Sequence, residues 1–356
     1  MKHIRELSDL RIGLNEFIHT RGISGSSVGA KLFTEVLEKN AVTIVRIRPR
    51  INSKSRVFRL IYMIYWDLYG ASRIAQRHQC DAVVNPTNTG RTSRKLPNIL
   101  VMHDTMVLDI PQYFDAGYRW YAKLLFGISA RSANLIITPS IFSARSISRR
   151  WPTAVPKVAN WPNRLQQSEI KTERDSRSIL WVASLDQHKR FELCVQVVEF
   201  LRKTAAIDLK LIVITRKGND RTAMEKYQGE NSKLFDWIEW NYEISDSKLI
   251  ELYRTSKLLL VTSVAEGFCL PALEAMSQGL PVVHPNIGAL VELCGEMDGD
   301  ANNSEFQVLA SNALHLIQDE NYWHNQSLSS IIRSKEYEYE FFEEIILREL
   351  QSLLCK

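Results

Sequence analysis

The sequence predicts an α/β protein built from two doubly wound domains, each with a parallel sheet. The chain has 356 residues, which is too long for one ordinary hydrophobic core and fits two domains of about 150 to 180 residues each. Short apolar runs alternate with helical segments, the pattern of parallel strands joined by crossover helices. This alternation restarts near the middle of the chain, as expected for two such domains in tandem.

Five apolar runs in each half are expected to form the strands. In the first half they cover residues 11–17, 42–48, 81–86, 98–104 and 134–140. In the second half they cover residues 178–185, 209–216, 236–244, 257–263 and 280–285. The stretch 151–177 between the halves contains prolines and is then charged and poor in apolar side chains, which is typical of a linker.

The segment 337–354 carries apolar and aromatic residues at helical spacing with glutamates between them, so it predicts a long amphipathic helix. Because no strand follows it, we expect this helix to pack back on the first domain. The predicted division is therefore 1–165 together with 337–356 for the N-terminal domain, and 176–336 for the C-terminal domain.

Composition is that of a soluble globular protein. No run of about 18 apolar residues occurs and the N-terminus lacks the apolar core of a signal peptide, so we expect a cytoplasmic protein. The five cysteines are scattered and never spaced C-x-x-C, which argues against a disulfide framework and a thiolate metal site.

Charge is concentrated in one segment. Between Lys39 and Trp66 there is no acidic residue, while seven residues are cationic. An apolar and aromatic stretch follows, so residues 46–69 resemble an interfacial anchor that would hold the protein on the anionic inner face of the cytoplasmic membrane. A buried helix preceded by a solvated basic loop fits equally well. No nucleic-acid-binding motif accompanies the charge, so no nucleic-acid partner is expected.

Two glutamates lie eight positions apart in EGFCLPALEAMSQG, residues 266–279. Because Pro271 favours the first turn of a helix and Gly279 favours its end, we expect a strand at 257–263, a loop, and then a helix. Glu266 then lies on the loop and Glu274 one turn into the helix, both facing the crevice where open α/β sheets bind ligands. A helix N-terminus favours phosphate, and carboxylates accept hydrogen bonds from hydroxyl pairs. Together these groups suit a nucleotide sugar.

The same stretch resembles the E-x7-E signature of the retaining, GT-B-fold glycosyltransferases of family 4. The similarity continues in SLDQHKR (184–190), in the strand and helix around 240–263, in the glycine loop TRGISGSSVGAKLF (20–33), and in VMHDT (101–105). It extends over essentially the whole chain and implies two Rossmann-like domains facing across a cleft.

The resemblance implies a role for each matching residue. Glu274 would hold the ribose hydroxyls, Glu266 the hydroxyls of the transferred sugar, and Lys189 the diphosphate. Gly25 would let the first domain approach the phosphates, and His103 would lie near the reacting face of the sugar. The remaining donor-binding residues implied by the family are Phe268, Cys269, Leu270, Ser184 and Tyr242. The resemblance implies that no metal is obligatory, so neither a metal nor a cofactor is expected.

Three positions differ from the common family pattern. Ser184 replaces an arginine found in many members, and members with S-L-D-x-x-K often use mannose or rhamnose donors, which favours GDP-mannose or dTDP-rhamnose. Cys269 replaces glycine or serine, and Tyr242 replaces a glycine beside the base.

The sequence thus predicts a retaining, metal-independent glycosyltransferase that extends a lipid-linked bacterial surface polysaccharide. The alternative is a non-catalytic homologue that binds nucleotide sugar and supports a partner transferase. A nucleotide-sugar oxidoreductase or epimerase ranks last, because GISGSSVG lacks the G-x-G-x-x-G spacing.

Overall fold

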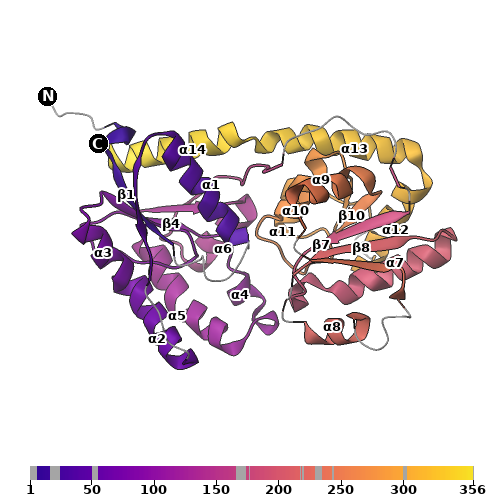
Figure 1. Cartoon of the computed structure of the whole chain (residues 1–356), viewed down its shortest axis with the longest axis horizontal. Coiled ribbons are helices and arrows are strands. Elements are labelled where there is room, and N and C mark those ends of the chain that lie inside the picture. The colour runs from indigo at the N-terminus through magenta and orange to yellow at the C-terminus, as the bar shows by residue number, and fades with distance from the viewer. Residues whose placement is uncertain are drawn as a thin grey trace. The chain divides into compact units, whose positions relative to one another are not determined.

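The computed structural model divides the chain into two compact units, Met1–Trp161 with Tyr339–Lys356, and Pro162–Glu338 (Figure 1). From the sequence, the division is expected between residues 165 and 176 and the return at residue 337. Each unit contains one parallel sheet with helices, so the predicted fold class is confirmed. The structure describes residues 6–16, 25–49, 55–165, 174–175, 177–216, 218, 220–228, 235–242, 244–299 and 303–355.

The sheet of the first unit has six parallel strands in the order β2-β1-β3-β4-β5-β6. Their bounds are β1 (Arg11–Asn15), β2 (Thr43–Ile47), β3 (Ala82–Asn85), β4 (Asn98–Val101), β5 (Leu135–Thr138) and β6 (Pro156–Val158). The sixth strand lies inside the stretch predicted to be linker, so that prediction was wrong for residues 156–158. A strand of three residues that begins with proline gives little sequence signal, and proline is tolerated here because β6 is an edge strand.

The helices of the first unit include one that returns from the far end of the described chain. They are η1 (Leu7–Asp9), α1 (Gly25–Lys39), α2 (Arg56–Tyr65), the π-helical turn η3 (Trp66–Gly70), α3 (Ala71–Arg77), α4 (Met106–Asp109), η4 (Pro111–Tyr113), α5 (Ala116–Ser132), α6 (Ile141–Arg150) and α14 (Tyr339–Leu354). On α14, Phe342 is buried and meets Trp161 edge-on with 5.5 Å between ring centroids. Glu343 of the same helix accepts a hydrogen bond of 2.6 Å from Lys39 of α1. These contacts fix α14 to the first unit.

The sheet of the second unit has five parallel strands in the order β11-β10-β7-β8-β9. Their bounds are β7 (Ser178–Val182), β8 (Lys210–Thr215), β9 (Ile238–Tyr242), β10 (Leu258–Leu260) and β11 (Val282–Val283). The helices are η5 (Gln187–Lys189), α7 (Phe191–Ala205), α8 (Arg221–Gln228), α9 (Asp246–Thr255), α10 (Leu270–Ser277), α11 (Gly288–Cys294), α12 (Glu305–Gln318), α13 (Glu320–Ser334) and η7 (Lys335–Tyr337).

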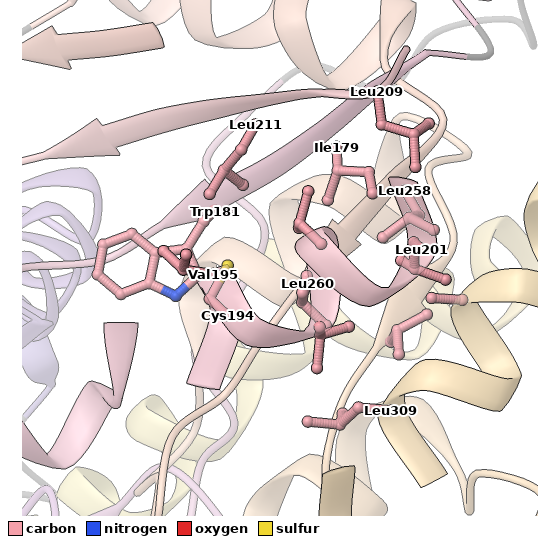
Figure 2. Close-up of a cluster of buried hydrophobic side chains, with 14 of the residues drawn as sticks. Ile179, Trp181, Cys194, Val195, Leu201, Leu209, Leu211, Leu258, Leu260 and Leu309 are labelled. Atoms are coloured by element: carbon pink, nitrogen blue, oxygen red, sulfur yellow. The ribbon is translucent and has the colours of Figure 1, made fainter. Parts of the chain in front are cut away.

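The core of the second unit holds the sheet on its helices. Figure 2 shows side chains of β7, β8 and β10, such as Trp181, Leu211 and Leu260, gathered with Val195 of α7 and Leu309 of α12. All five are buried, and burying an aliphatic side chain stabilises the fold by about 1.5–3 kcal/mol. The packed strands therefore form a rigid scaffold that holds the loops at their carboxyl ends. Among the helices of the described residues, none has both the length and the apolar character needed to cross a membrane.

Candidate active site

The candidate site begins where the winding of the second sheet reverses. The chain runs from β7 to β8 and β9 on one side, whereas β10 lies on the other side of β7. The loops that follow β7 and β10 therefore leave the same edge of the sheet next to each other. In open α/β sheets this reversal point is where ligands bind. Lys189 lies on the first of these loops and Glu266 on the second.

Lys189 and Glu266 form a buried ion pair. The Lys189 Nζ lies 2.6 Å from Glu266 Oε1, and the Ser263 hydroxyl donates to the same oxygen at 2.6 Å. Burial opposes ionisation of Glu266, but Lys189 and the hydrogen bonds outweigh it and hold the pKa of Glu266 below its ordinary value. Burial likewise opposes the charge of Lys189, and Glu266 outweighs it and raises the pKa of Lys189. Both groups are therefore charged near neutral pH.

Arg190 joins the two loops. It adopts the left-handed conformation with φ of 50° between η5 and α7. Its guanidinium donates to the carbonyl of Thr262 at 2.7 Å and to that of Ser263 at 3.2 Å, while Thr262 donates back to the Lys189 carbonyl at 2.7 Å. Because these bonds connect the loop after β7 to the loop after β10, the Lys189–Glu266 pair has a fixed frame.

The backbone of Gly218 packs closely against the loop after β7. A Cβ atom at this position would lie 1.9 Å from the Leu185 carbonyl oxygen, so only glycine allows this approach of the two backbones. The Asp220 N–H donates to the same oxygen at 2.8 Å. Ser184, at the start of the loop, is half-buried and its hydroxyl donates to the Asp186 carboxylate.

The loop after β10 ends at the N-terminus of α10. Cys269 precedes the helix with φ of 81°, Leu270 is its first residue, and Phe268 is buried against Tyr337 with 5.7 Å between ring centroids. The first N–H groups of a helix have no partner within it, and the helix dipole makes this end positive. Since Pro271 carries no N–H, the amides at and just before Leu270 are the ones that can meet an anion.

Glu274 lies one turn into α10 and is only 2% exposed. Arg164 donates to its Oε1 from Nε at 2.9 Å and also from Nη2, and the Tyr253 hydroxyl donates to its Oε2 at 3.2 Å. Burial raises the pKa of Glu274, and the Arg164 guanidinium acts against this rise. Each glutamate of the pair thus has its own cationic partner, Lys189 for Glu266 and Arg164 for Glu274.

Residues 163–304, which contain this whole arrangement, match the family described as Glycosyl transferases group 1. The second unit is a group 1 glycosyl transferase domain. The chain is 24% identical over 255 residues to the O-antigen chain mannosyltransferase B of Escherichia coli, covering 68% of this chain and 67% of that protein. It is 23% identical over 282 residues to the O-antigen chain mannosyltransferase RfbU of Salmonella typhimurium, covering 79% and 77%.

A solved structure extends the likeness to both units. Anabaena Alr3699/HepE in complex with UDP and glucose matches with a TM-score of 0.69 at 15% identity, over 97% of this chain and 100% of that chain. At this identity the match establishes the fold, and the predicted GT-B fold of the glycosyltransferase is confirmed.

Two predicted site residues of the glycosyltransferase belong to the first unit. His103 is buried after β4; its Nε2 lies 2.8 Å from the Pro86 carbonyl and its ring 5.7 Å from that of Trp161. Gly25 is the first residue of α1, and the part of the glycine loop before it lies outside the described residues. Tyr242 ends β9 in the second unit, is exposed, and is separated from β7 by β8. Its predicted contact with the base stays a prediction.

Buried histidines are a further electrostatic feature of the glycosyltransferase. Burial lowers the pKa of each to about 4, so all are neutral at neutral pH. They are His103, His188 and His284.

Four residues of the site were not predicted: Arg164, Arg190, Tyr253 and Ser263. Arg164 lies in the stretch interpreted as linker, and its partner Glu274 is 110 positions away. Tyr253 follows Leu252 on the buried side of α9, a pattern that indicates only core. Ser263, three positions before Glu266, could have been predicted, because a hydroxyl one loop turn before a buried carboxylate is a common donor to it.

Proposed function

We propose that the protein is a retaining, metal-independent glycosyltransferase that moves a hexose from a nucleotide diphosphate to a growing bacterial surface polysaccharide. The observation that carries this proposal is the pair of buried glutamates at the reversal point of the second sheet. Each has a cationic partner, and α10 begins between them. A nucleotide sugar carries a pair of hydroxyls on each side of its diphosphate, one on the ribose and one on the sugar, and each pair can donate hydrogen bonds to one carboxylate.

The donor would use these groups as follows. Glu274 would accept the ribose hydroxyls, Glu266 the hydroxyls of the transferred sugar, and the amides around Leu270 would meet the phosphates. Lys189 would neutralise the diphosphate as it leaves, which in a water-poor site is worth several kcal/mol. Phe268, Cys269, Ser184 and Tyr242 would line the donor, with His103 and Gly25 contributed by the first unit.

Retention of the anomeric configuration would follow from attack on the face that the diphosphate leaves. The leaving phosphate oxygen would accept the proton of the acceptor hydroxyl, so no separate protein base is required. Glu266 is poorly suited to be that base, because its pKa is held below the ordinary value. Its role is instead to orient the sugar.

Glu274 must exchange partners when donor binds. A carboxylate offers about four acceptor positions, and Arg164 and Tyr253 together use three. A ribose diol requires two, so at least one existing bond must be released. We therefore expect donor affinity to reflect both the new bonds and the release of Arg164 or Tyr253.

Mannose is the sugar we favour, with rhamnose second, and hence GDP-mannose or dTDP-rhamnose as donor. This choice is supported by the relatives, which are named O-antigen chain mannosyltransferases. The same names support an O-antigen chain as acceptor. We further propose that this acceptor is lipid-linked, which would bring the enzyme to the inner face of the cytoplasmic membrane.

The first test is a thermal-shift measurement of the purified protein with UDP, GDP and dTDP. A ligand that binds only the native state raises the midpoint by mass action, and we expect the largest shift with GDP. The shift should disappear in Glu274→Gln, which keeps the shape of the side chain but removes its charge. If no nucleotide shifts the midpoint of folded protein, the proposed donor site is wrong.

A transfer assay separates the enzyme from the non-catalytic alternative. With GDP-mannose as donor and membranes that contain the lipid-linked oligosaccharide as acceptor, we expect Glu266→Gln to lower kcat/KM by roughly a hundredfold or more. The affinity for GDP should change little. Glu251→Gln, an exposed residue of α9, is the matched control and should keep activity. A wild-type protein that binds nucleotide sugar and transfers nothing would favour the non-catalytic homologue.

A further inference from the structure

Apolar side chains remain exposed along one helix of the first unit. The segments α2, η3 and α3 follow one another without a break over residues 56–77, and Figure 1 shows α2 at the lower edge of this unit. Phe58 is 54% exposed and Ile61 is 59% exposed. We call the following set the exposed stripe: Val57, Phe58, Ile61, Tyr65 and Tyr69.

Four members of the exposed stripe, Val57, Ile61, Tyr65 and Tyr69, are spaced four residues apart, with Phe58 beside the first of them. The same spacing continues through Arg73 to Arg77. In an α-helix with 3.6 residues per turn, a step of four advances by about 40° around the axis. Over several steps such a row would wind to the buried side. The π turn η3, between α2 and α3, has more residues per turn than an α turn, so a step of four residues there rotates the row in the opposite direction around the axis. The row therefore stays on the solvent side along the whole helix.

Buried polar contacts hold the π turn in place. Asp67 accepts hydrogen bonds from the Tyr121 hydroxyl and from Thr89 at 3.2 Å, and the indole N–H of Trp66 donates to Asn15 at 2.9 Å. These bonds reach α5 and β1, so the register of the helix is anchored by the body of the unit. The exposed stripe is thus a fixed surface.

The exposed charges on the helix that carries the exposed stripe have one sign. Between Glu38 and Asp81 the only acidic residue is Asp67, and it is buried. Arg59, Arg73 and Arg77 are exposed on the same helix. A second copy of the chain is a poor occupant, because a two-fold contact through this face would bring these arginines together.

Other cations of the basic segment are structural. Arg46 and Arg48 both donate to the buried carboxylate of Glu16, so they are needed at the end of β1. Arg50 and Lys54 lie outside the described residues. The surface available for a partner is therefore the helix 56–77, which shifts the predicted 46–69 segment toward the C-terminus: residues 46–55 are left out and residues 70–77 are added.

We propose that the exposed stripe docks on an anionic lipid bilayer, with its apolar side chains among the acyl chains and its arginines at the headgroups. Amphipathic helices with aromatic and cationic residues bind membranes in this way. The proposal rests on the proposed function for its purpose, because a lipid-linked acceptor would be presented at the same surface.

The test is flotation of the full chain with vesicles of phosphatidylethanolamine and phosphatidylglycerol, and with vesicles of phosphatidylcholine alone. We expect binding to the anionic vesicles only. The double variant Phe58→Ser with Ile61→Ser should bind at least about tenfold more weakly. The matched control is Leu328→Ser with Ile332→Ser, on α13 of the second unit, where the exposures are 51% and 59%. This control should bind like wild type.

Three results would overturn the proposal. They are absence of wild-type binding to anionic vesicles, unchanged binding by the stripe variant, and a wild-type dimer in solution that the stripe variant converts to monomer. The last would identify a protein interface instead. Because the nucleotide thermal shift is measured without lipid, a failure of vesicle binding with an intact shift would leave the donor site supported and reject only the docking surface.

Discussion

Replacing Arg164 by alanine should expose how strongly the buried Glu274 depends on its partner. In the variant the carboxylate keeps only the Tyr253 hydroxyl, at 3.2 Å, and stays almost fully buried. Removing one member of a buried ion pair costs about 3–5 kcal/mol of stability, because the remaining charge is left without compensation. We expect a loss of this size in the free energy of unfolding of the second unit at pH 7–8.

The loss should depend on pH in a defined direction. Without Arg164, burial is opposed by the remaining Tyr253 hydrogen bond and no longer by the guanidinium, so the pKa of Glu274 rises further above its unfolded value. A carboxyl group whose folded pKa is raised binds protons more readily in the folded state, so its penalty is present above the folded pKa and disappears below the unfolded pKa. The destabilisation should therefore shrink between pH 7 and pH 4.

Urea unfolding followed by tryptophan fluorescence would measure this. The double variant Arg164→Ala with Glu274→Gln should recover most of the loss, because it removes the unpaired charge as well. The coupling between the two substitutions is then at least about 2 kcal/mol. Additive effects, or a loss that grows toward acid pH, would refute the idea that Arg164 stabilises the fold by neutralising Glu274.

Three further predictions concern the frame of the site. Cys269→Val should lower the free energy of unfolding by about 2 kcal/mol or more in urea melts, because a β-branched side chain is strained at φ of 81°. Cys269→Gly should change the same free energy by less than about 1 kcal/mol. Equal effects of the two substitutions would exclude backbone strain as the cause. Gly218→Ala should weaken GDP binding in a calorimetric titration, because the added Cβ atom displaces the Leu185 backbone. In the control Gly117→Ala the atom nearest to the added Cβ lies 3.3 Å away, so GDP should bind normally. The free energy of unfolding should fall as the pH is lowered from about 6.5 to 4, because the lowered pKa values of the buried histidines let the unfolded chain bind protons before the folded chain does. His284→Gln should reduce this pH dependence by up to one bound proton. An unchanged pH dependence of stability in the variant would contradict the reasoning.

Much of the fold follows from local patterns in the sequence. All ten predicted strands are found, for example 178–185 as β7 and 257–263 as β10, because fully buried parallel strands need continuous apolar runs. The helix of Glu274 also begins and ends where Pro271 and Gly279 predict. These signals act over a few residues and are therefore visible in one chain.

Features that depend on distant contacts were not predictable. The neighbours of Glu274 come from positions 164 and 253, and no local pattern connects them. The π turn at 66–70 requires one extra residue per turn, which Asp67 stabilises through Tyr121, 54 positions away. That Lys189 meets Glu266 depends on strand order, since β7 and β10 are neighbours although β8 and β9 lie between them in sequence.

The return of α14 to the first unit has a consequence for the order of synthesis. The sheet of the first unit is made first, but Phe342, Ile346 and Leu350, which are buried on α14, are made only after the whole of the second unit. Domains usually fold in the order in which they leave the ribosome. Here the second unit has all its segments while the first still exposes the apolar surface that α14 will cover. The nascent chain therefore has an interval in which the earlier unit depends on chaperones or on its own partial stability, and that interval ends when Tyr339–Leu354 emerges.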